Sequence, residues 1–134
     1  MHTLRPWLRL LHFGPSVFTT LAFGVYIAIA ARGWPPPGAL ALLLAGQLAT
    51  QFAISLLNDY WDLPLDRLTR PDKPLPAGLM AAGRVRALGW AVGALALLLA
   101  LPLGPRVLAC AAAGLGAGLA YDARLKRKIG RAHV

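Results

Sequence analysis

The sequence predicts an all-α, polytopic membrane protein, a bundle in which four helices cross the bilayer. The chain has 134 residues, of which 57% are hydrophobic, and a soluble domain of this size could not bury so much apolar surface. Only 14% of the residues are charged, and they gather in a few segments between long apolar runs. The net charge of +9 would suggest a nucleic-acid partner for a soluble protein. We expect no nucleic-acid partner here, because the basic residues lie beside membrane spans.

Four stretches are candidates for spans, which need about 20 mainly apolar residues, with roughly 17–25 tolerated. These stretches are Leu10–Ala31, Gly33–Leu57, Ala87–Pro105 and Val107–Tyr121. The fourth is short, so its helix has to use flanking residues. Backbone at membrane depth must satisfy its own hydrogen bonds, which favours helices. We therefore expect helices near 14–31, 38–62, 85–102 and 105–122.

Proline and glycine mark the turns between these helices. The segment Gly33–Gly38 contains three consecutive prolines, and Pro102 and Pro105 flank Leu-Gly, so neither segment continues a helix. The remaining connection, Arg67–Arg86, is longer, polar and basic.

The basic residues predict the orientation in the membrane. Twelve of the fourteen Lys and Arg residues lie in the N-terminal segment, the Arg67–Arg86 connection and the C-terminal segment. The two turns that would lie on the opposite side hold only Arg32 and Arg106. Because cytoplasmic loops of membrane proteins are enriched in Lys and Arg, we expect both termini and the 63–86 loop to be cytoplasmic in an inner or cell membrane.

An acidic cluster begins where the second predicted span reaches the cytoplasmic surface. All five acidic residues are Asp, and four of them fall within fourteen residues. Asn58, Asp62 and Asp66 are spaced by four and share one helix face, with Asp59 beside it. Carboxylates at this depth are costly and indicate a functional site. Oxygen ligands with no His or Cys nearby suit Mg²⁺.

Basic residues follow the acids at once, at Arg67, Arg70 and Lys73. Acids that hold a metal ion followed by bases that hold an anion predict a diphosphate-binding site. The positive-inside rule is the better explanation for Arg84, Arg86 and the basic C-terminal segment Arg124–Arg131.

A polar stripe of Gln47, Gln51 and Ser55 continues this face along the second helix. Two interpretations of the glutamines stay open, a wet cavity that leads to the metal site and hydrogen bonds between helices. The single cysteine, Cys110, lies in an apolar stretch and is expected to be a packing residue.

The pattern Asn58-Asp-x-x-Asp62-x-x-x-Asp66, followed by Arg70-Pro-Asp-Lys-Pro-Leu-Pro-Ala-Gly78, resembles the first signature of the UbiA-type intramembrane prenyltransferases. Two weaker features agree with it, Arg5-Pro6-Trp7 before the first span and the segment from Tyr121 to Arg127 after the fourth. The resemblance covers residues from about 4 to 128.

The resemblance implies Mg²⁺-dependent transfer of a prenyl group from an isoprenyl diphosphate to a small aromatic or lipid acceptor, of which a quinone precursor is the expected kind. It implies that Asn58, Asp62 and Asp66 hold the metal ion, and that Asp59, Asp62 and Asp66 are the catalytic acids. Arg67, Arg70 and Lys73 would contact the diphosphate. Tyr121 and Lys126 would lie at the mouth of the cavity.

The sequence departs from the family pattern in two places. Pro64 lies inside the signature and should kink or end the helix, so that Asp66 could reach the metal from a loop. The family bundle has about eight or nine helices and a second Asp-rich motif, which this sequence lacks. We therefore expect residues 1–128 to be the N-terminal half of the domain, and an inactive fragment.

The last six residues, 129–134, are expected to be a non-native tail, because ATC GGA AGA GCA CAC GTC encodes them and matches the start of a common sequencing adapter.

Two other functions compete with prenyl transfer. A transporter-like subunit would place its acids near the middle of the bilayer rather than at a helix end. A phospholipid headgroup transferase of the CDP-alcohol type also uses an Asp cluster with Mg²⁺, but its Asp-Gly and Ala-Arg pairs do not occur in this Asp segment.

Overall fold

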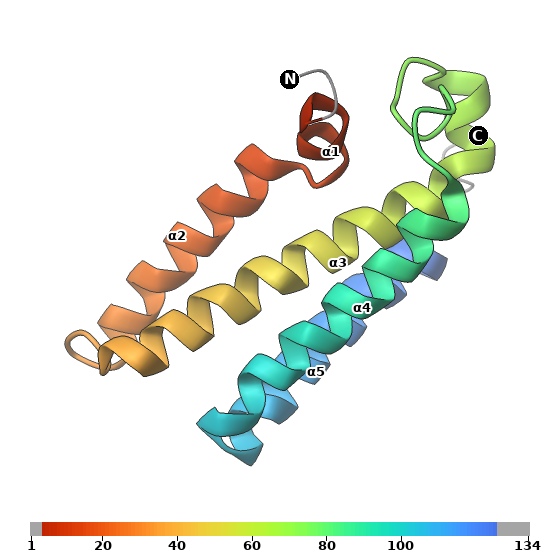
Figure 1. Cartoon of the computed structure of the whole chain (residues 1–134). Coiled ribbons are helices and arrows are strands. Elements are labelled where there is room, and N and C mark those ends of the chain that lie inside the picture. The colour runs from red at the N-terminus through yellow and green to blue at the C-terminus, as the bar shows by residue number, and fades with distance from the viewer. Residues whose placement is uncertain (1–3, 126–134) are drawn as a thin grey trace.

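The computed structural model describes residues 4–125, and all of its regular structure there is helical (Figure 1). The elements in chain order are α1 (Leu4–Leu10), α2 (Phe13–Ala30), α3 (Pro37–Thr69), α4 (Ala82–Ala100), the 3₁₀ turn η1 (Leu101–Leu103), α5 (Pro105–Ala120) and the π-helical turn η2 (Tyr121–Leu125). No strand occurs within these described residues. The all-α prediction is therefore confirmed.

Three helical stretches are long and apolar enough to cross a membrane, namely Phe13–Ala30, Pro37–Thr69 and Ala82–Leu103. The chain is thus a polytopic helical membrane protein. α5 has only 16 residues and continues into η2, as expected of a helix that needs flanking residues to span. The fourth span stays a prediction.

α3 is the central element, because α2, α4 and α5 all pack against it (Figure 1). Glycines allow the closest approaches. A Cβ added at Gly89 of α4 would lie 2.8 Å from Leu57 Cγ, and one added at Gly118 of α5 would overlap Ile54. Small residues at helix contacts are typical of membrane bundles, in which van der Waals packing replaces the hydrophobic effect between helices.

α3 does not end at Pro64. It continues to Thr69 with Pro64 inside it, and Figure 1 shows its last turns rising at an angle to the rest of the helix. The expected kink is present, but the prediction of a loop at Asp66 is wrong. Pro64 itself is exposed, while buried Leu63 and Asp66 fix the turns on either side of it. The connection to α4 is correspondingly shorter than predicted, 70–81.

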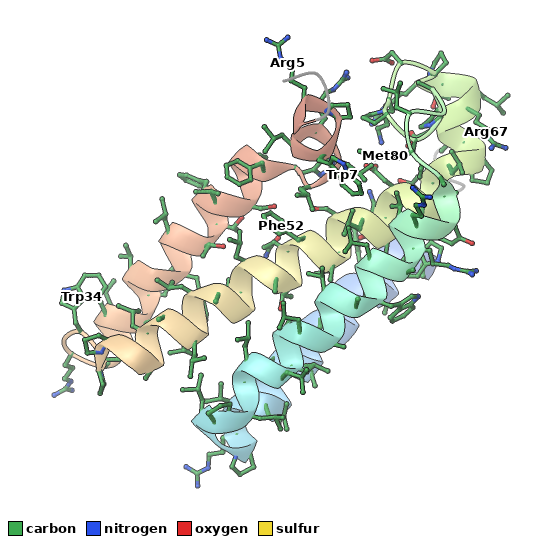
Figure 2. The ribbon with its side chains drawn as sticks, in the orientation of Figure 1. Arg5, Trp7, Trp34, Phe52, Arg67 and Met80 are labelled. Atoms are coloured by element: carbon green, nitrogen blue, oxygen red, sulfur yellow. The ribbon has the colours of Figure 1, made fainter. Side chains whose placement is uncertain are left out.

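The short helix α1 was not predicted, since it has seven residues and no long apolar run. It packs through Leu10 on a buried cluster at the end of the bundle where α3 meets the 70–81 connection. The buried members of this cluster are Leu10, Leu56, Leu63, Leu75 and Val85. Trp7 of α1 and Met80 of the connection also pack on it, and they lie close together in Figure 2. α1 therefore covers one side of the acidic segment of α3.

Candidate active site

Two of the predicted acids are buried on one face of α3. Asp59 is 3% exposed and Asp66 is 4% exposed. They are seven residues apart, which is two helical turns, so their side chains point the same way. Asn58 and Asp62 are half-buried on the adjoining part of the helix surface. Buried carboxylates need a partner of opposite charge, because an isolated charge in an apolar environment is strongly disfavoured.

Lys73 supplies that partner. Its Nζ donates to Asp59 Oδ1 at 3.0 Å and to Asp66 Oδ2 at 2.7 Å. The Lys73 side chain is 18% exposed, so this pair of bonds is largely shielded from water. Burial by itself lowers the pKa of Lys73, but the hydrogen bonds and charges of Asp66 and Asp59 outweigh it, and the pKa is raised above its usual 10.5. Lys73 is therefore a protonated ammonium at neutral pH.

The fold of the 70–81 connection places Lys73 there. The two residues after it, Pro74 and Leu75, are buried, and Leu75 belongs to the core cluster described above. The Ala77 N–H donates to the Lys73 carbonyl at 2.9 Å, and Gly78 adopts a φ of +73° that closes the turn. On the other side, the Lys73 N–H donates to the Arg70 carbonyl at 3.1 Å, so the backbone is held before and after Lys73 and directs its side chain onto α3.

The other two predicted diphosphate ligands lie differently. Arg67 and Arg70 are exposed at the end of α3, and Figure 2 shows Arg67 on the outer side of its last turns. Of the three predicted diphosphate ligands, the structure thus brings Lys73 into contact with the acids. It leaves the two arginines exposed at the end of α3. Tyr121, expected at the cavity mouth, is exposed. Lys126, expected beside it, and the 129–134 tail lie outside the described residues.

Two further links around the site were not predicted. Arg9 of α1 forms an ion pair of 3.3 Å with Asp72, the residue before Lys73, and both side chains are exposed. Arg86 of α4 lies 5.6 Å from the centre of the Tyr60 ring and donates to its hydroxyl at 3.4 Å. The sequence gives no spacing signal for either link, because each joins elements that only the tertiary fold brings together.

The donor set suits a hard divalent cation. Asn58, Asp59, Asp62 and Asp66 offer only oxygen ligands, which Mg²⁺ prefers. Within residues 4–125 no three acidic, His or Cys side chains converge closely enough to hold a metal ion by themselves. Mg²⁺ usually binds through one or two carboxylates together with waters and substrate phosphates, so a site of this kind does not require three. Lys73 already places a cation between two of the candidates.

A separate pocket of about 170 Å³ lies between α2, α3, α4 and α5. Most of its lining is apolar, and its polar members include Gln47 and Thr50 of α3. Gln47 therefore borders a cavity, but this cavity is mainly apolar and its lining does not include the acids, so the wet cavity leading to the metal site stays a prediction; Gln51 is not part of the lining. Cys110 also borders the pocket. Gln47 precedes Asp59 by twelve residues, a distance of about 18 Å along a straight helix.

Comparison with known proteins identifies the family. A sequence model of the UbiA prenyltransferase family matches residues 16–133, which is most of the chain. The chain belongs to the UbiA prenyltransferase family. Its long apolar helices and this membership together make it an integral membrane protein. Family members generally use divalent metal ions, which agrees with the oxygen donors on α3.

The curated relatives of this UbiA-family chain include several archaeal proteins named digeranylgeranylglyceryl phosphate synthase. The one from Ignicoccus hospitalis is 37% identical over 83 residues, covering 62% of this chain and 27% of the relative. The Methanoregula boonei protein is 44% identical over 50 residues, covering 37% and 17%. The Methanosarcina barkeri protein is 27% identical over 97 residues, covering 69% and 34%. The chain thus spans at most about a third of these relatives. No solved structure matches it.

Proposed function

We propose that this chain forms the diphosphate-binding side of a Mg²⁺-dependent prenyltransferase that moves a prenyl group from an isoprenyl diphosphate to a lipid acceptor. The observation that carries the proposal is the buried arrangement of Asp59, Lys73 and Asp66 at the end of a membrane helix in a UbiA-family chain. Family membership favours prenyl transfer over the transporter-like subunit and the headgroup transferase.

The acids at the end of α3 would hold the metal ion. Asn58, Asp62 and Asp66 are the proposed ligands, and Asp59 supports Asp66 from two turns earlier on the same face. When bound, the divalent cation neutralises the charge that builds up on the diphosphate as its bond to the allylic carbon breaks. Lys73, Arg67 and Arg70 would bind the remaining phosphate oxygens through charge-assisted hydrogen bonds.

The pocket between α2, α3, α4 and α5 suits the hydrocarbon part of the substrate. Its lining is mainly apolar, and such walls exclude the water that would otherwise capture a reactive allylic carbon. Its distance from the acids along α3 leaves room for an extended chain whose diphosphate end stays at the carboxylates. The Thr50 hydroxyl donates to the Gly46 carbonyl of its own helix at 2.9 Å, so this polar group needs no partner from the substrate.

The acceptor is proposed from the relatives. Their name specifies a glyceryl phosphate that carries two geranylgeranyl groups as the product. A prenylated glyceryl phosphate is therefore favoured over the aromatic, quinone-precursor acceptor that the sequence resemblance suggested. We place the reaction at the cytoplasmic surface, where the positive-inside rule puts the 70–81 connection.

The donor proposal is tested by binding. The purified chain in lipid nanodiscs should bind radiolabelled geranylgeranyl diphosphate in the presence of Mg²⁺ and lose this binding when EDTA is added. Asp62→Asn should weaken it at least about tenfold, because a carboxylate ligand is replaced by a neutral one. The control Arg106→Gln, which removes an exposed charge on the predicted opposite side, should bind like the unmodified chain. Binding that is indifferent to EDTA and to Asp62→Asn would contradict the proposal.

The acceptor is tested in the same preparation. A glyceryl phosphate bearing one geranylgeranyl ether should raise the thermal unfolding midpoint of the donor-loaded chain, and 4-hydroxybenzoate should not. Stabilisation by the aromatic compound alone would favour the quinone-precursor acceptor instead. Prenyl transfer to either compound would contradict the expectation that this chain is inactive by itself.

A further inference from the structure

The ammonium of Lys73 lies between two carboxylates, in the kind of position that a metal ion would take. Both Asp59 Oδ1 and Asp66 Oδ2 contact the same Nζ, at 3.0 and 2.7 Å, so the two oxygens lie within 5.7 Å of each other. Both acids are nearly inaccessible to solvent. Water therefore screens their mutual repulsion poorly, and the Lys73 ammonium between them offsets it.

We propose that Lys73 is an exchangeable counter-ion: it neutralises the Asp59–Asp66 pair until a divalent cation binds, and the cation then displaces it from Asp66. The inference rests on the proposed function in one respect, that a divalent cation binds at Asp66. It adds that the metal ion competes with a side chain of this chain, and that metal binding is coupled to the 70–81 connection.

The charges favour an exchange over joint occupancy. One ammonium and two carboxylates leave a net charge of −1, whereas a divalent cation in its place gives neutrality. A divalent cation and an ammonium in contact with the same carboxylate would repel strongly, because charges interact more strongly in a buried environment than in water. The ammonium is also the mobile partner. It sits on a flexible four-carbon stem, while both acids are fixed on α3.

Departure of Lys73 would loosen the connection that carries it. A second charged link between this connection and the rest of the chain, the pair Asp72–Arg9, is exposed, and exposed pairs contribute little. The connection is otherwise held by the buried Pro74 and Leu75 and by its own backbone hydrogen bonds. Metal binding should therefore free the Lys73 side of the connection and leave the ammonium beside the metal, within reach of a diphosphate.

Hydrogen exchange on the unmodified chain tests the coupling without any substrate. Mn²⁺ is added to the chain in nanodiscs, and amide exchange is followed by mass spectrometry. The amides of Lys73 and Ala77, which are hydrogen-bonded within the connection, should exchange severalfold faster with Mn²⁺ bound. Peptides from α2 should not change. Unchanged or slower exchange in the connection with Mn²⁺ bound would overturn the inference.

A charge-removing variant tests the competition. Lys73→Met should bind Mn²⁺ roughly tenfold more tightly than the unmodified chain, measured by electron paramagnetic resonance, because no ammonium competes. Arg84→Met, which removes an exposed positive charge at the start of α4, is the matched control and should stay within about twofold. Equal Mn²⁺ affinities in the two variants would overturn the exchange but leave the metal site standing. Absence of Mn²⁺ binding in every variant would overturn both. If Lys73→Met does not fold, the exchange data on the unmodified chain decide.

Discussion

At the scale of single residues, burial separates acids that look alike in the sequence. Asp59 and Asp72 each pair with a basic side chain, but Asp59 is shielded from water and Asp72 is open to it. A charge that loses its partner in a buried site has no solvent to replace it, whereas an exposed charge does. The two pairs should therefore differ in their effect on stability although their sequence context is similar.

Asp59→Asn should lower the free energy of unfolding by about 2 kcal/mol, because it removes one charged acceptor from a buried ammonium. Asp72→Asn should change it by less than about 0.5 kcal/mol, since the side chains of Asp72 and Arg9 are 76% and 61% exposed. Circular dichroism of the chain in detergent micelles during denaturant titration measures both. Equal effects of the two substitutions would show that Lys73 does not depend on Asp59.

The sequence predicted the participants of this cluster but not how they pair. Asp59, Asp66 and Lys73 were all identified as site residues, and the seven-residue spacing of the two acids was visible. Their pairing depends on the connection folding back so that Leu75 is buried against α3. That fold is set by tertiary packing, which local spacing does not encode. The exposed positions of Arg67 and Arg70 also depend on the tertiary fold. They follow from the continuation of α3 past Pro64, which carries both residues to the end of the helix.

At the scale of helices, three of the predicted spans correspond to helices that are long and apolar enough to cross a membrane, while the end of α3 depended on packing. Pro64 predicted either a kink or a helix end, on the general rule that proline disrupts helices. In the structure, flanking contacts hold α3 together beyond it, and the proline only bends the helix. α1 was not predicted because it is short. It is stabilised by the packing of Leu10 and Trp7 in the core cluster, which a local sequence pattern does not show.

Pro64→Ala should straighten α3 and move Asp66 away from its present alignment with Lys73. Alanine restores the backbone N–H and removes the ring that bends the helix, so helix content should be kept or slightly raised. Mn²⁺ binding should weaken severalfold, because the acids no longer share the present geometry. Circular dichroism and electron paramagnetic resonance give the two quantities. Unchanged Mn²⁺ affinity in a straightened helix would show that the bend is irrelevant to the site.

Gly89→Ala should separate α3 from α4. The added methyl group would lie 2.8 Å from Leu57 Cγ, a distance that forces Leu57 or the helix to shift, and we expect a loss of about 1–3 kcal/mol in unfolding free energy. Gly83→Ala in the same helix is the control, because nothing lies within 4 Å of its added Cβ. It should leave stability unchanged or raise it by up to about 1 kcal/mol through higher helix propensity. Denaturant titration measures the unfolding free energy of both variants. Similar losses in the two would contradict close packing at Gly89.

At the scale of the whole molecule, the predicted functional groups gather at one end of the bundle. α1, the last turns of α3 and the 70–81 connection meet there, and the turns after α2 and α4 lie at the other end (Figure 1). The distribution of basic residues in the sequence predicted this division, since most Lys and Arg residues lie in the segments expected at the first of these two ends. The helices thus hold the acids at one end of the bundle, with the apolar pocket further along α3 between the helices.

Cysteine labelling tests which surface that is. In a Cys110→Ser background, Ala77→Cys in the connection and Ala31→Cys after α2 both introduce exposed thiols. In intact bacterial cells a membrane-impermeant maleimide should modify Cys only at position 31, because the positive-inside rule places the connection in the cytoplasm. Both positions should react after the cells are permeabilised, which controls for thiol accessibility. The reverse pattern in intact cells would place the acids of α3 at the outer surface. That result would refute cytoplasmic binding of the diphosphate while leaving the helical fold unaffected.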